Sequence, residues 1–431
     1  MIAKTFQISN YKALNYALPT DQLLDPEKVY IGLTSPRCKD YTLNVKEGDT
    51  VKVGQVVAVK SCSFFELPVH ATVSGTVTGT LKKWSGMGVK DTFLEITNDY
   101  QETPDDSLVD RDEATLDALS KEELIGIVKD RAIIGLGGSA FPTYIKLETK
   151  ETIEHVVINA AECEPYLSSD YRAIKDFTRE IVLGLKYVMK MVGANHGHIA
   201  VKKTKDVLID TLHEEMTHHP ESMDVKLLQD FYPQGWENAT FKNALGITVP
   251  IGELPMKYGI LGINVSTASA IYKALKHNLP ITERYVTMNG DALSFPQNLR
   301  VKVGTNVQEL IAKSDGFKVD SERIELISGG PMMGKSIPTD DLVVTPTTTS
   351  ILAFNVNDYV EEPCVRCGSC VLSCPADLQP VQIMNAVKKK DMESLQAFNP
   401  KNCIECGLCS YVCTSKIDVT DWVKKGKAMV K

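Results

Sequence analysis

Two cysteine-rich stretches near the C-terminus decide how this chain is interpreted. Residues 364–375 read CVRCGSCVLSCP, and residues 403–413 read CIECGLCSYVC. In both, two residues separate each of the first three cysteines and three residues precede the fourth, which is the spacing of two-cluster ferredoxins. Three thiolates on one tight loop can reach three corners of an iron–sulfur cube, while the fourth cysteine leaves on the following helix. The pattern therefore predicts two [4Fe-4S] clusters.

The fourth cysteine of such a stretch usually serves the other cluster. The expected ligands are Cys364, Cys367, Cys370 and Cys413 for the first cluster, and Cys403, Cys406, Cys409 and Cys374 for the second. Zinc fits less well because it uses four ligands in two C-x-x-C pairs. Disulfides need an oxidising compartment, and the N-terminus shows no secretory pattern. The other cysteines, Cys38, Cys62 and Cys163, are expected to be small buried hydrophobic side chains.

Composition limits the class of protein. The 431 residues are 43% hydrophobic and 24% charged, so we expect several folded domains. A net charge of −8 argues against a nucleic-acid partner. The most apolar stretch, residues 258–272, is too short for a bilayer and contains Asn264. We therefore expect no transmembrane segment in the chain, and only peripheral contact with a membrane.

The first hundred residues show alternating apolar positions and glycine turns that are typical of strands. Residues 45–58 and 69–77 resemble the barrel-sandwich repeat of biotinyl and lipoyl carrier domains. The hairpin tip of such a domain carries a modified lysine, but residues 61–66 read SCSFFE. We therefore expect a barrel-sandwich domain that serves as a docking scaffold.

After an acidic linker at residues 101–112, a glycine-rich loop begins the next domain. Residues 134–146 read IGLGGSAFPTYIK. Glycines let the backbone approach a phosphate, and a helix that begins at Pro142 would add its positive end. A glycine cluster is more often a simple turn, so this loop alone is a weak indication of a nucleotide site.

The segment that follows supports a site. A strand at residues 155–159 runs into AAECEP, and further helices and strands alternate at residues 168–192, 198–203, 205–217 and 225–229. This alternation predicts a parallel sheet, in which ligands bind at the carboxyl ends of the strands. Glu162 and Glu164 would lie at such an end. By spacing alone, a solvated loop is the simpler interpretation of these two glutamates.

Taken in order, these motifs resemble the RnfC subunit of the Rnf electron-transport complex. More distantly, residues 112–285 resemble the flavin- and NADH-binding subunit of respiratory complex I. The matching segments are Gly135 to Lys146, Asn159 to Pro165, Tyr232 to Gly235 and Asn264 to Thr267, together with the cysteine stretches. The resemblance covers almost the whole chain.

The resemblance implies two further cofactors, FMN and NAD(H). FMN would lie against Gly135, Gly137 and Gly138, with Lys146 near its phosphate or the nucleotide, and with Asn159, Asn264 and Thr267 lining the flavin. Glu162, Glu164 and Tyr232 are the candidates for contact with NADH. A flavin accepts hydride and releases single electrons, so no catalytic acid–base pair is expected.

The expected architecture is multidomain α/β. Its parts are a barrel-sandwich domain at residues 1–100, a Rossmann-like FMN/NADH domain at 112–282, a β-grasp module of the soluble ligand-binding (SLBB) type at 283–345, and a helical two-cluster ferredoxin-like domain at 351–431. The motif GGPMMG at residues 329–334 is interpreted only as a turn.

The function implied is electron transfer between NADH and an iron–sulfur partner in an anaerobe, by the NAD-reacting subunit of an Rnf-type ferredoxin:NAD oxidoreductase. Partners would be other Rnf-type subunits or a ferredoxin-like carrier, and the protein would be cytoplasmic, on the inner face of the cell membrane. Residues 6–11, Ala161 and Thr414 depart from the family pattern. They leave two alternatives open: a soluble relative that feeds a cytoplasmic reductase such as proline reductase, and a non-catalytic ferredoxin-like adaptor.

Overall fold

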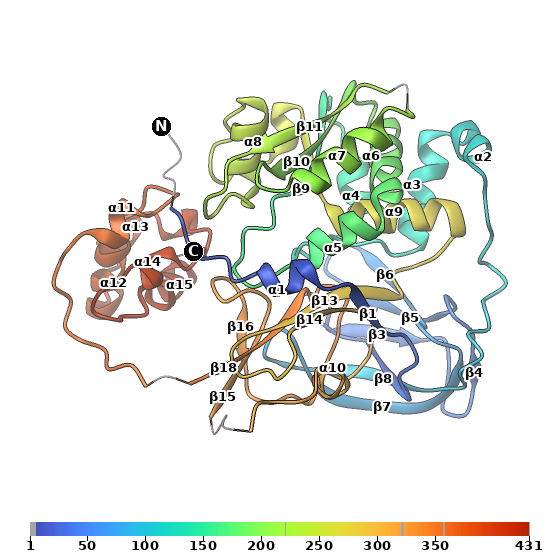
Figure 1. Cartoon of the computed structure of the whole chain (residues 1–431), viewed down its shortest axis with the longest axis horizontal. Coiled ribbons are helices and arrows are strands. Elements are labelled where there is room, and N and C mark those ends of the chain that lie inside the picture. Colours follow the sequence, from blue (N-terminus) through green and yellow to red (C-terminus); the bar gives the residue numbers. More distant parts are fainter. Residues whose placement is uncertain (1–5, 220, 320–322, 357, 431) are drawn as a thin grey trace.

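The computed structural model describes residues 6–219, 221–319, 323–356 and 358–430. Figure 1 shows a β-rich barrel, an α/β domain above it, a mixed sheet beside the barrel, and a small helical domain at one side. A long connection after the mixed sheet leads to the helical domain, which lies close to the N-terminal segment.

The barrel is built from two small sheets. Its strands are β2 (Lys28–Gly32), β3 (Asp40–Leu43), β4 (Thr50–Val51), β5 (Val56–Ser61), β6 (Glu66–His70), β7 (Gly75–Ser85) and β8 (Lys90–Asn98). One sheet has the order β17-β7-β8-β2, in which β17 is the short strand Leu342–Val343 and β4 pairs with β7, and the other has the order β3-β5-β6. Alternating residues such as Val29, Ile31 and Ile96 are buried between the sheets. The expectation of separate buried thiols is wrong for Cys38 and Cys62, whose sulfurs are bonded to each other.

The α/β domain contains a four-stranded parallel sheet in the order β11-β10-β9-β12. Its elements are α2 (Glu113–Ala118), α3 (Lys121–Asp130), α4 (Thr143–Leu147), β9 (His155–Ala160), α5 (Ser169–Asp176), α6 (Thr178–Val192), β10 (His196–Lys202), α7 (Asp206–Met216), β11 (Met223–Leu228), α8 (Glu237–Leu245), β12 (Ile260–Asn264) and α9 (Val265–His277). The parallel sheet confirms the alternation read from the sequence. The single helix expected at residues 168–192 is wrong, because Phe177 has non-helical dihedral angles and its ring packs edge-on against Tyr285.

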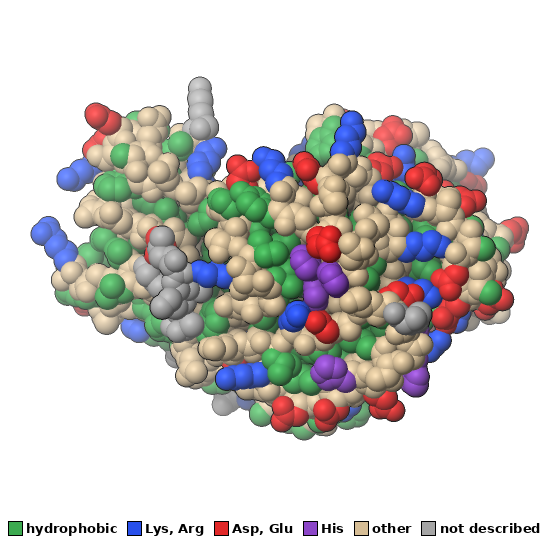
Figure 2. All heavy atoms as spheres, turned by 90° about the horizontal axis from the view of Figure 1, so that it is seen from above, with side chains coloured by type: hydrophobic (Ala, Val, Ile, Leu, Met, Phe, Trp, Pro, Cys, Tyr) green, Lys and Arg blue, Asp and Glu red, His purple; other side chains and the backbone are tan. Residues whose placement is uncertain are grey.

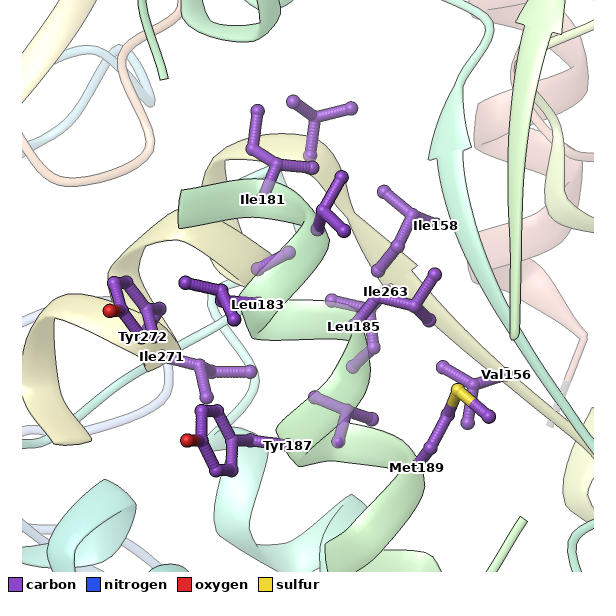
Figure 3. Close-up of a cluster of buried hydrophobic side chains, with 14 of the residues drawn as sticks. Val156, Ile158, Ile181, Leu183, Leu185, Tyr187, Met189, Ile263, Ile271 and Tyr272 are labelled. Atoms are coloured by element: carbon purple, nitrogen blue, oxygen red, sulfur yellow. The ribbon is translucent and has the colours of Figure 1, made fainter. Parts of the chain in front are cut away.

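The core of this domain lies where α6 and α9 cover one face of the sheet. Figure 3 shows Val156 and Ile158 of β9 meeting Leu185 of α6 and Ile263 of β12. A Cβ on Gly184 would lie 2.2 Å from the carbonyl oxygen of Ala268, so the two helices approach to backbone contact. This packing holds the carboxyl ends of β9 and β12 side by side.

The mixed sheet draws its strands from distant parts of the chain. Its order is β1-β14-β13-β18-β15-β16. The elements are α1 (Ala13–Ala17), β1 (Thr20–Leu23), β13 (Glu283–Asn289), β14 (Gln297–Lys302), α10 (Val307–Lys313), β15 (Ile324–Ser328), β16 (Lys335–Ile337) and β18 (Ser350–Asn355), while β17 (Leu342–Val343) joins the barrel. The expected boundaries therefore need correction, because residues 20–23 and 350–355 belong to this sheet. Its assignment to the β-grasp class stays a prediction.

Short helices surround the cysteines of the C-terminal domain. They are α11 (Ser369–Leu372), α12 (Pro380–Lys389), α13 (Met392–Ala397), α14 (Leu408–Tyr411) and α15 (Val419–Met429). Two helices, α12 and α13, follow the first cysteine stretch in place of one, because Lys390 adopts a φ of +56° and Asp391 begins a new helix by capping the N–H of Ser394. In the part of the chain that the structure describes, no helix has the length and apolarity needed to cross a membrane.

Candidate functional site

A cavity of about 940 Å³ lies at the carboxyl ends of β9 and β12. This volume is typical of a site for a cofactor-sized ligand. Nine of the ten residues predicted to hold FMN or NADH line it, namely Gly135, Gly137, Gly138, Lys146, Asn159, Glu162, Glu164, Asn264 and Thr267. The cavity extends from the barrel at one end to Cys406 at the other.

The glycine loop forms one wall of this cavity. The N–H of Gly135 donates to the carbonyl of Phe141 at 2.8 Å, which closes the loop, and the N–H of Leu136 donates to Thr267 Oγ1 at 2.9 Å. A Cβ on Gly137 would lie 3.1 Å from the Cβ of Asn264, and Gly138 has a φ of +104°. Glycine is thus needed at both positions, once for close approach and once for conformation. The tight backbone fits a flavin or a phosphate laid against it.

Asn264 links this loop to a buried carboxyl group that the sequence did not indicate. Its Oδ1 caps α9 by accepting from the N–H of Ser266, and its Nδ2 donates to Asp170 Oδ2 at 2.9 Å. Burial, with Glu162 nearby, raises the pKa of Asp170 to about 6. No residue pattern marked Asp170, because it is one polar residue in the first turn of α5.

A second residue missed by the sequence analysis is Arg284 of β13. Its Nη2 donates to the carbonyl of Leu136 at 2.9 Å, so the mixed sheet supports the glycine loop from behind. Burial lowers the pKa of Arg284 to about 10, and the negative charge of Asp170 opposes that shift. Two buried charged groups, Asp170 and Arg284, thus hold the wall of the cavity in place.

Asn159 and Lys146 hold the opposite side. Asn159 Nδ2 donates to the carbonyl of Gly235 at 2.9 Å, which ties β9 to the segment before α8. Lys146 Nζ lies 3.4 Å from the carbonyl oxygen of Gly262 and 3.9 Å from Glu237 Oε1. Glu237 also lines the cavity, and it was not singled out because it lies just beyond the matched motif.

Glu162 is buried rather than solvated. Its Oε1 accepts from the N–H of Asp170 at 2.9 Å, and its carbonyl oxygen accepts from Lys12 Nζ at 2.9 Å. Lys12 is 2% exposed, and burial lowers its pKa. The interpretation of Glu162 as part of a solvated loop is therefore wrong. The N-terminal segment anchors this glutamate, and one of its oxygens, Oε2, has no hydrogen-bond partner among the described residues.

Glu164 and Tyr232 connect the cavity to the second cysteine block, defined as residues 403–413. The hydroxyl of Tyr232 donates to the carbonyl of Cys406 at 2.7 Å and lies 3.2 Å from Glu164 Oε1. Glu164 Oε2 accepts from the N–H of Met332 at 3.0 Å, and burial raises the pKa of Glu164 to about 7. Tyr232 is 1% exposed and does not line the cavity, so the structure gives it a packing role in place of the expected contact with NADH.

The motif at residues 329–334 has a similar connecting position. A Cβ on Gly330 would lie 2.0 Å from Glu164 Oε2, and a Cβ on Gly407 would lie 2.6 Å from the carbonyl oxygen of Met332. The turn therefore fits between the glutamate and the second cysteine block, which explains why it needs so little side-chain volume.

One of the two predicted sets of cluster ligands lies together in the structure, and the grouping of the other set, Cys364, Cys367, Cys370 and Cys413, stays a prediction. The set that lies together, Cys374, Cys403, Cys406 and Cys409, lines one small cavity of about 20 Å³. Burial raises the pKa of Cys406 and of Cys409 to about 12, so their thiolates need a bound metal to form at neutral pH. Within the described ranges, no three His, Cys, Asp or Glu side chains converge on a single metal ion.

The two cysteine blocks differ in exposure. In the first block, defined as residues 364–374, Cys364 and Cys367 are exposed, whereas Cys406 of the second block is 7% exposed. The face in Figure 2 carries acidic and basic side chains interspersed, and no broad basic area is seen on it. That face offers no footprint for a nucleic acid.

Three family models match the chain. Residues 2–101 match the RnfC barrel sandwich hybrid domain, residues 128–273 match the Nuo51 FMN-binding domain, and residues 358–414 match the 4Fe-4S dicluster domain. These matches confirm the barrel-sandwich, FMN-binding and two-cluster domains, and with them FMN and two [4Fe-4S] clusters as cofactors.

A solved structure supports the fold alone. The NAD+-reducing [NiFe]-hydrogenase in the H2-reduced state aligns with a TM-score of 0.51 at 14% identity, covering 72% of this chain and 63% of that one.

Curated relatives match at the level of sequence. The RnfC subunit of the Na(+)-translocating ferredoxin:NAD(+) oxidoreductase complex of Acetobacterium woodii is 34% identical over 87% of this chain and 84% of its own length. Its proton-translocating counterpart in Clostridium ljungdahlii is 31% identical over 90% and 83%. The corresponding subunit of the ion-translocating oxidoreductase complex of Vibrio cholerae is 31% identical over 92% of this chain and 50% of its own. The chain therefore belongs to the RnfC family of Rnf complex subunits.

Proposed function

We propose that this protein transfers electrons between NADH and an iron–sulfur partner, as the NAD-reacting subunit of an Rnf-type ferredoxin:NAD oxidoreductase. The observation that carries the proposal is the single cavity that is lined by the glycine loop and reaches Cys406. FMN, when bound, supplies the conversion between hydride and single electrons that nicotinamide and clusters require.

Different residues of the cavity would bind the flavin and the nucleotide. The glycine loop, Thr267, Asn159 and Asn264 would hold the flavin, because their backbone and side-chain polar groups line the cavity. Glu162 and Glu164 would face the nucleotide. No proton has to be moved by a catalytic acid or base, so the role of the chain is to bind, orient and exclude water.

The two cysteine blocks suggest an order of electron transfer. The second block contacts the cavity through Tyr232 and Glu164, so its cluster would exchange electrons with the flavin. The first block exposes Cys364 and Cys367, and it also contains Val365 and Leu372, which are 68% and 72% exposed. We infer that this side meets the partner, which would be another subunit of the complex or a ferredoxin-like carrier.

The relatives named above are subunits of ion-translocating complexes. By that relationship we propose that the protein sits peripherally on the inner face of the cell membrane, and that the ion path lies in other subunits.

One anaerobic purification from the native host tests the proposal. Iron content, flavin content and co-purifying chains would be measured on the same sample, and NADH would then be added while flavin absorbance and cluster EPR signals are followed. We expect flavin, two clusters, reduction by NADH and integral membrane partners. A soluble reductase as the partner would contradict the membrane assignment, and clusters without flavin or NADH reactivity would contradict the enzymatic role.

A further inference from the structure

The barrel forms one wall of the cavity. The proposed function assigns no ligand contact to the residues of this wall. Residues of the barrel that line this wall include Arg37, Lys60, Phe65, His70 and Asp91. Figure 1 shows β5 and β6 on the side of the barrel that faces the α/β domain. The cavity is therefore an interdomain site, in which the barrel lies opposite the glycine loop.

Lys60 is the unusual residue of this wall. It lies on β5, and its ammonium would lie 3.8 Å from a Cβ added at Gly32. Burial lowers the pKa of Lys60 to about 8, and the charge of Asp91 only partly opposes this. The Lys60 ammonium has no hydrogen-bond or ion-pair partner among the described residues. A half-buried cation that lines a cavity without a partner is stabilised when a ligand supplies the opposite charge.

Arg37 brings a second cation to the same side of the cavity. Its Nη1 donates to the carbonyl of Ser139 at 3.2 Å, so the barrel contacts the glycine loop directly. A guanidinium has five N–H donors, and no carboxylate in the part of the chain described here pairs with this one. The bond between Cys38 and Cys62 ties the Arg37 loop to the hairpin that follows Lys60.

Two cations opposite a glycine loop form a binding site for a phosphate-bearing ligand. The match to an FMN-binding domain covers residues 128–273 and excludes the barrel, so the contacts of FMN are expected within that domain. The barrel wall is then available for the second ligand of the cavity. A dinucleotide carries a pyrophosphate with two negative charges, which suits two cations.

We propose that the barrel-sandwich domain completes the nicotinamide nucleotide site, with Lys60 and Arg37 binding the pyrophosphate of NAD(H). The inference rests on the proposed function and adds a role for the barrel. The barrel would then contribute residues to the nucleotide site as well as serving as a scaffold.

The test uses Lys60→Met in the full chain loaded with flavin and clusters. Calorimetry would measure the Kd for NAD+, and flavin content would be measured on the same sample. We expect the Kd to rise about tenfold, as for the loss of one charged contact, with flavin content unchanged. Reduction of the flavin by dihydronicotinamide riboside, which has no phosphate, is expected to keep its rate. Lys52→Met is the matched control, because Lys52 is a lysine of the same domain that already pairs with Asp106 at 2.8 Å.

The outcomes separate this inference from the proposed function. If Lys60→Met loses flavin, the lysine binds the phosphate of FMN and the inference is overturned. An unchanged Kd for NAD+ would overturn it as well. If the unaltered protein is reduced by neither NADH nor the riboside, the proposed function fails and the inference fails with it. Arg37→Gln, at an exposed position, gives a second variant with an expected severalfold rise in Kd should Lys60→Met not fold.

Discussion

The two cysteine blocks have almost the same sequence and very different surroundings. The second block contacts the α/β domain through the hydroxyl of Tyr232 and the mixed sheet through the turn that contains Met332, and Cys406 is buried. The first block presents Cys364 and Cys367 at the surface. Ligand spacing thus predicts two similar clusters, whereas the neighbours of each block decide which block lies against the cavity and which block faces outward.

The largest expected effect comes from two substitutions, each of which removes one cluster ligand from one block. Cys406→Ser is expected to abolish reduction of both clusters by NADH, because electrons would reach the first cluster only through the second. Cys367→Ser is expected to remove the first cluster and leave reduction of the second intact. Freeze-quench EPR after mixing with NADH measures both. If NADH reduced the first cluster of Cys406→Ser as fast as that of the unaltered protein, electrons would not pass in this order.

Burial around the second block also predicts a pH dependence of stability. The folded chain raises the pKa of Glu164 from 4.5 to about 7, so the folded state binds a proton more tightly than the unfolded state does. The free energy of unfolding should then fall as pH rises from about 4.5 to about 7. Glu164→Gln removes this fall, so we expect the variant to be more stable than the parent by about 2–3 kcal/mol at pH 8.

Urea denaturation of the holoprotein under anaerobic conditions at pH 5.5 and pH 8 measures this difference. Glu361→Gln changes an exposed glutamate near the first block and serves as the control. Parallel pH profiles for Glu164→Gln and the parent would mean that the contact region is more hydrated than its burial indicates.

The hydrogen bond from Tyr232 to Cys406 offers a smaller test. Tyr232→Phe leaves a buried carbonyl without its donor, so we expect a loss of about 1–2 kcal/mol in stability. Reduction of the second cluster should slow, while flavin content stays unchanged. Tyr359→Phe, at a tyrosine that is 70% exposed beside the first block, should alter neither quantity. Equal effects of the two substitutions would remove the distinction between the blocks.

The smallest expected effect concerns reduction potential. Lys427 Nζ donates to the carbonyl of Cys403 and to Glu405 Oε1, both at 2.8 Å. Its positive charge favours the reduced, more negative cluster, so Lys427→Met should lower the potential of the second cluster by about 10–40 mV. Redox titration followed by EPR measures both clusters together, with the first as internal control. A shift in the reduction potential of the first cluster, with that of the second unchanged, would contradict the assignment of Cys403 to the second cluster.

Sequence reasoning was accurate where function depends on local spacing. The glycine loop, the parallel strands and the grouping of Cys374 with the second block all follow from patterns within short segments. It was less accurate where distant segments meet. The role of Tyr232, the supporting contacts of Asp170 and Arg284, and the cross-link between Cys38 and Cys62 each need a partner far away in the chain.

By itself, the sequence determined the two clusters, because thiolate spacing is a local requirement of an iron–sulfur cube, and its resemblance to the RnfC family indicated the flavin. Only the tertiary structure decided how these parts communicate. The cavity joins the barrel, the glycine loop and Cys406, and residues 20–23 and 350–355 were drawn into one sheet. Such arrangements result from packing and burial, which depend on the whole chain and leave no signal within a single motif.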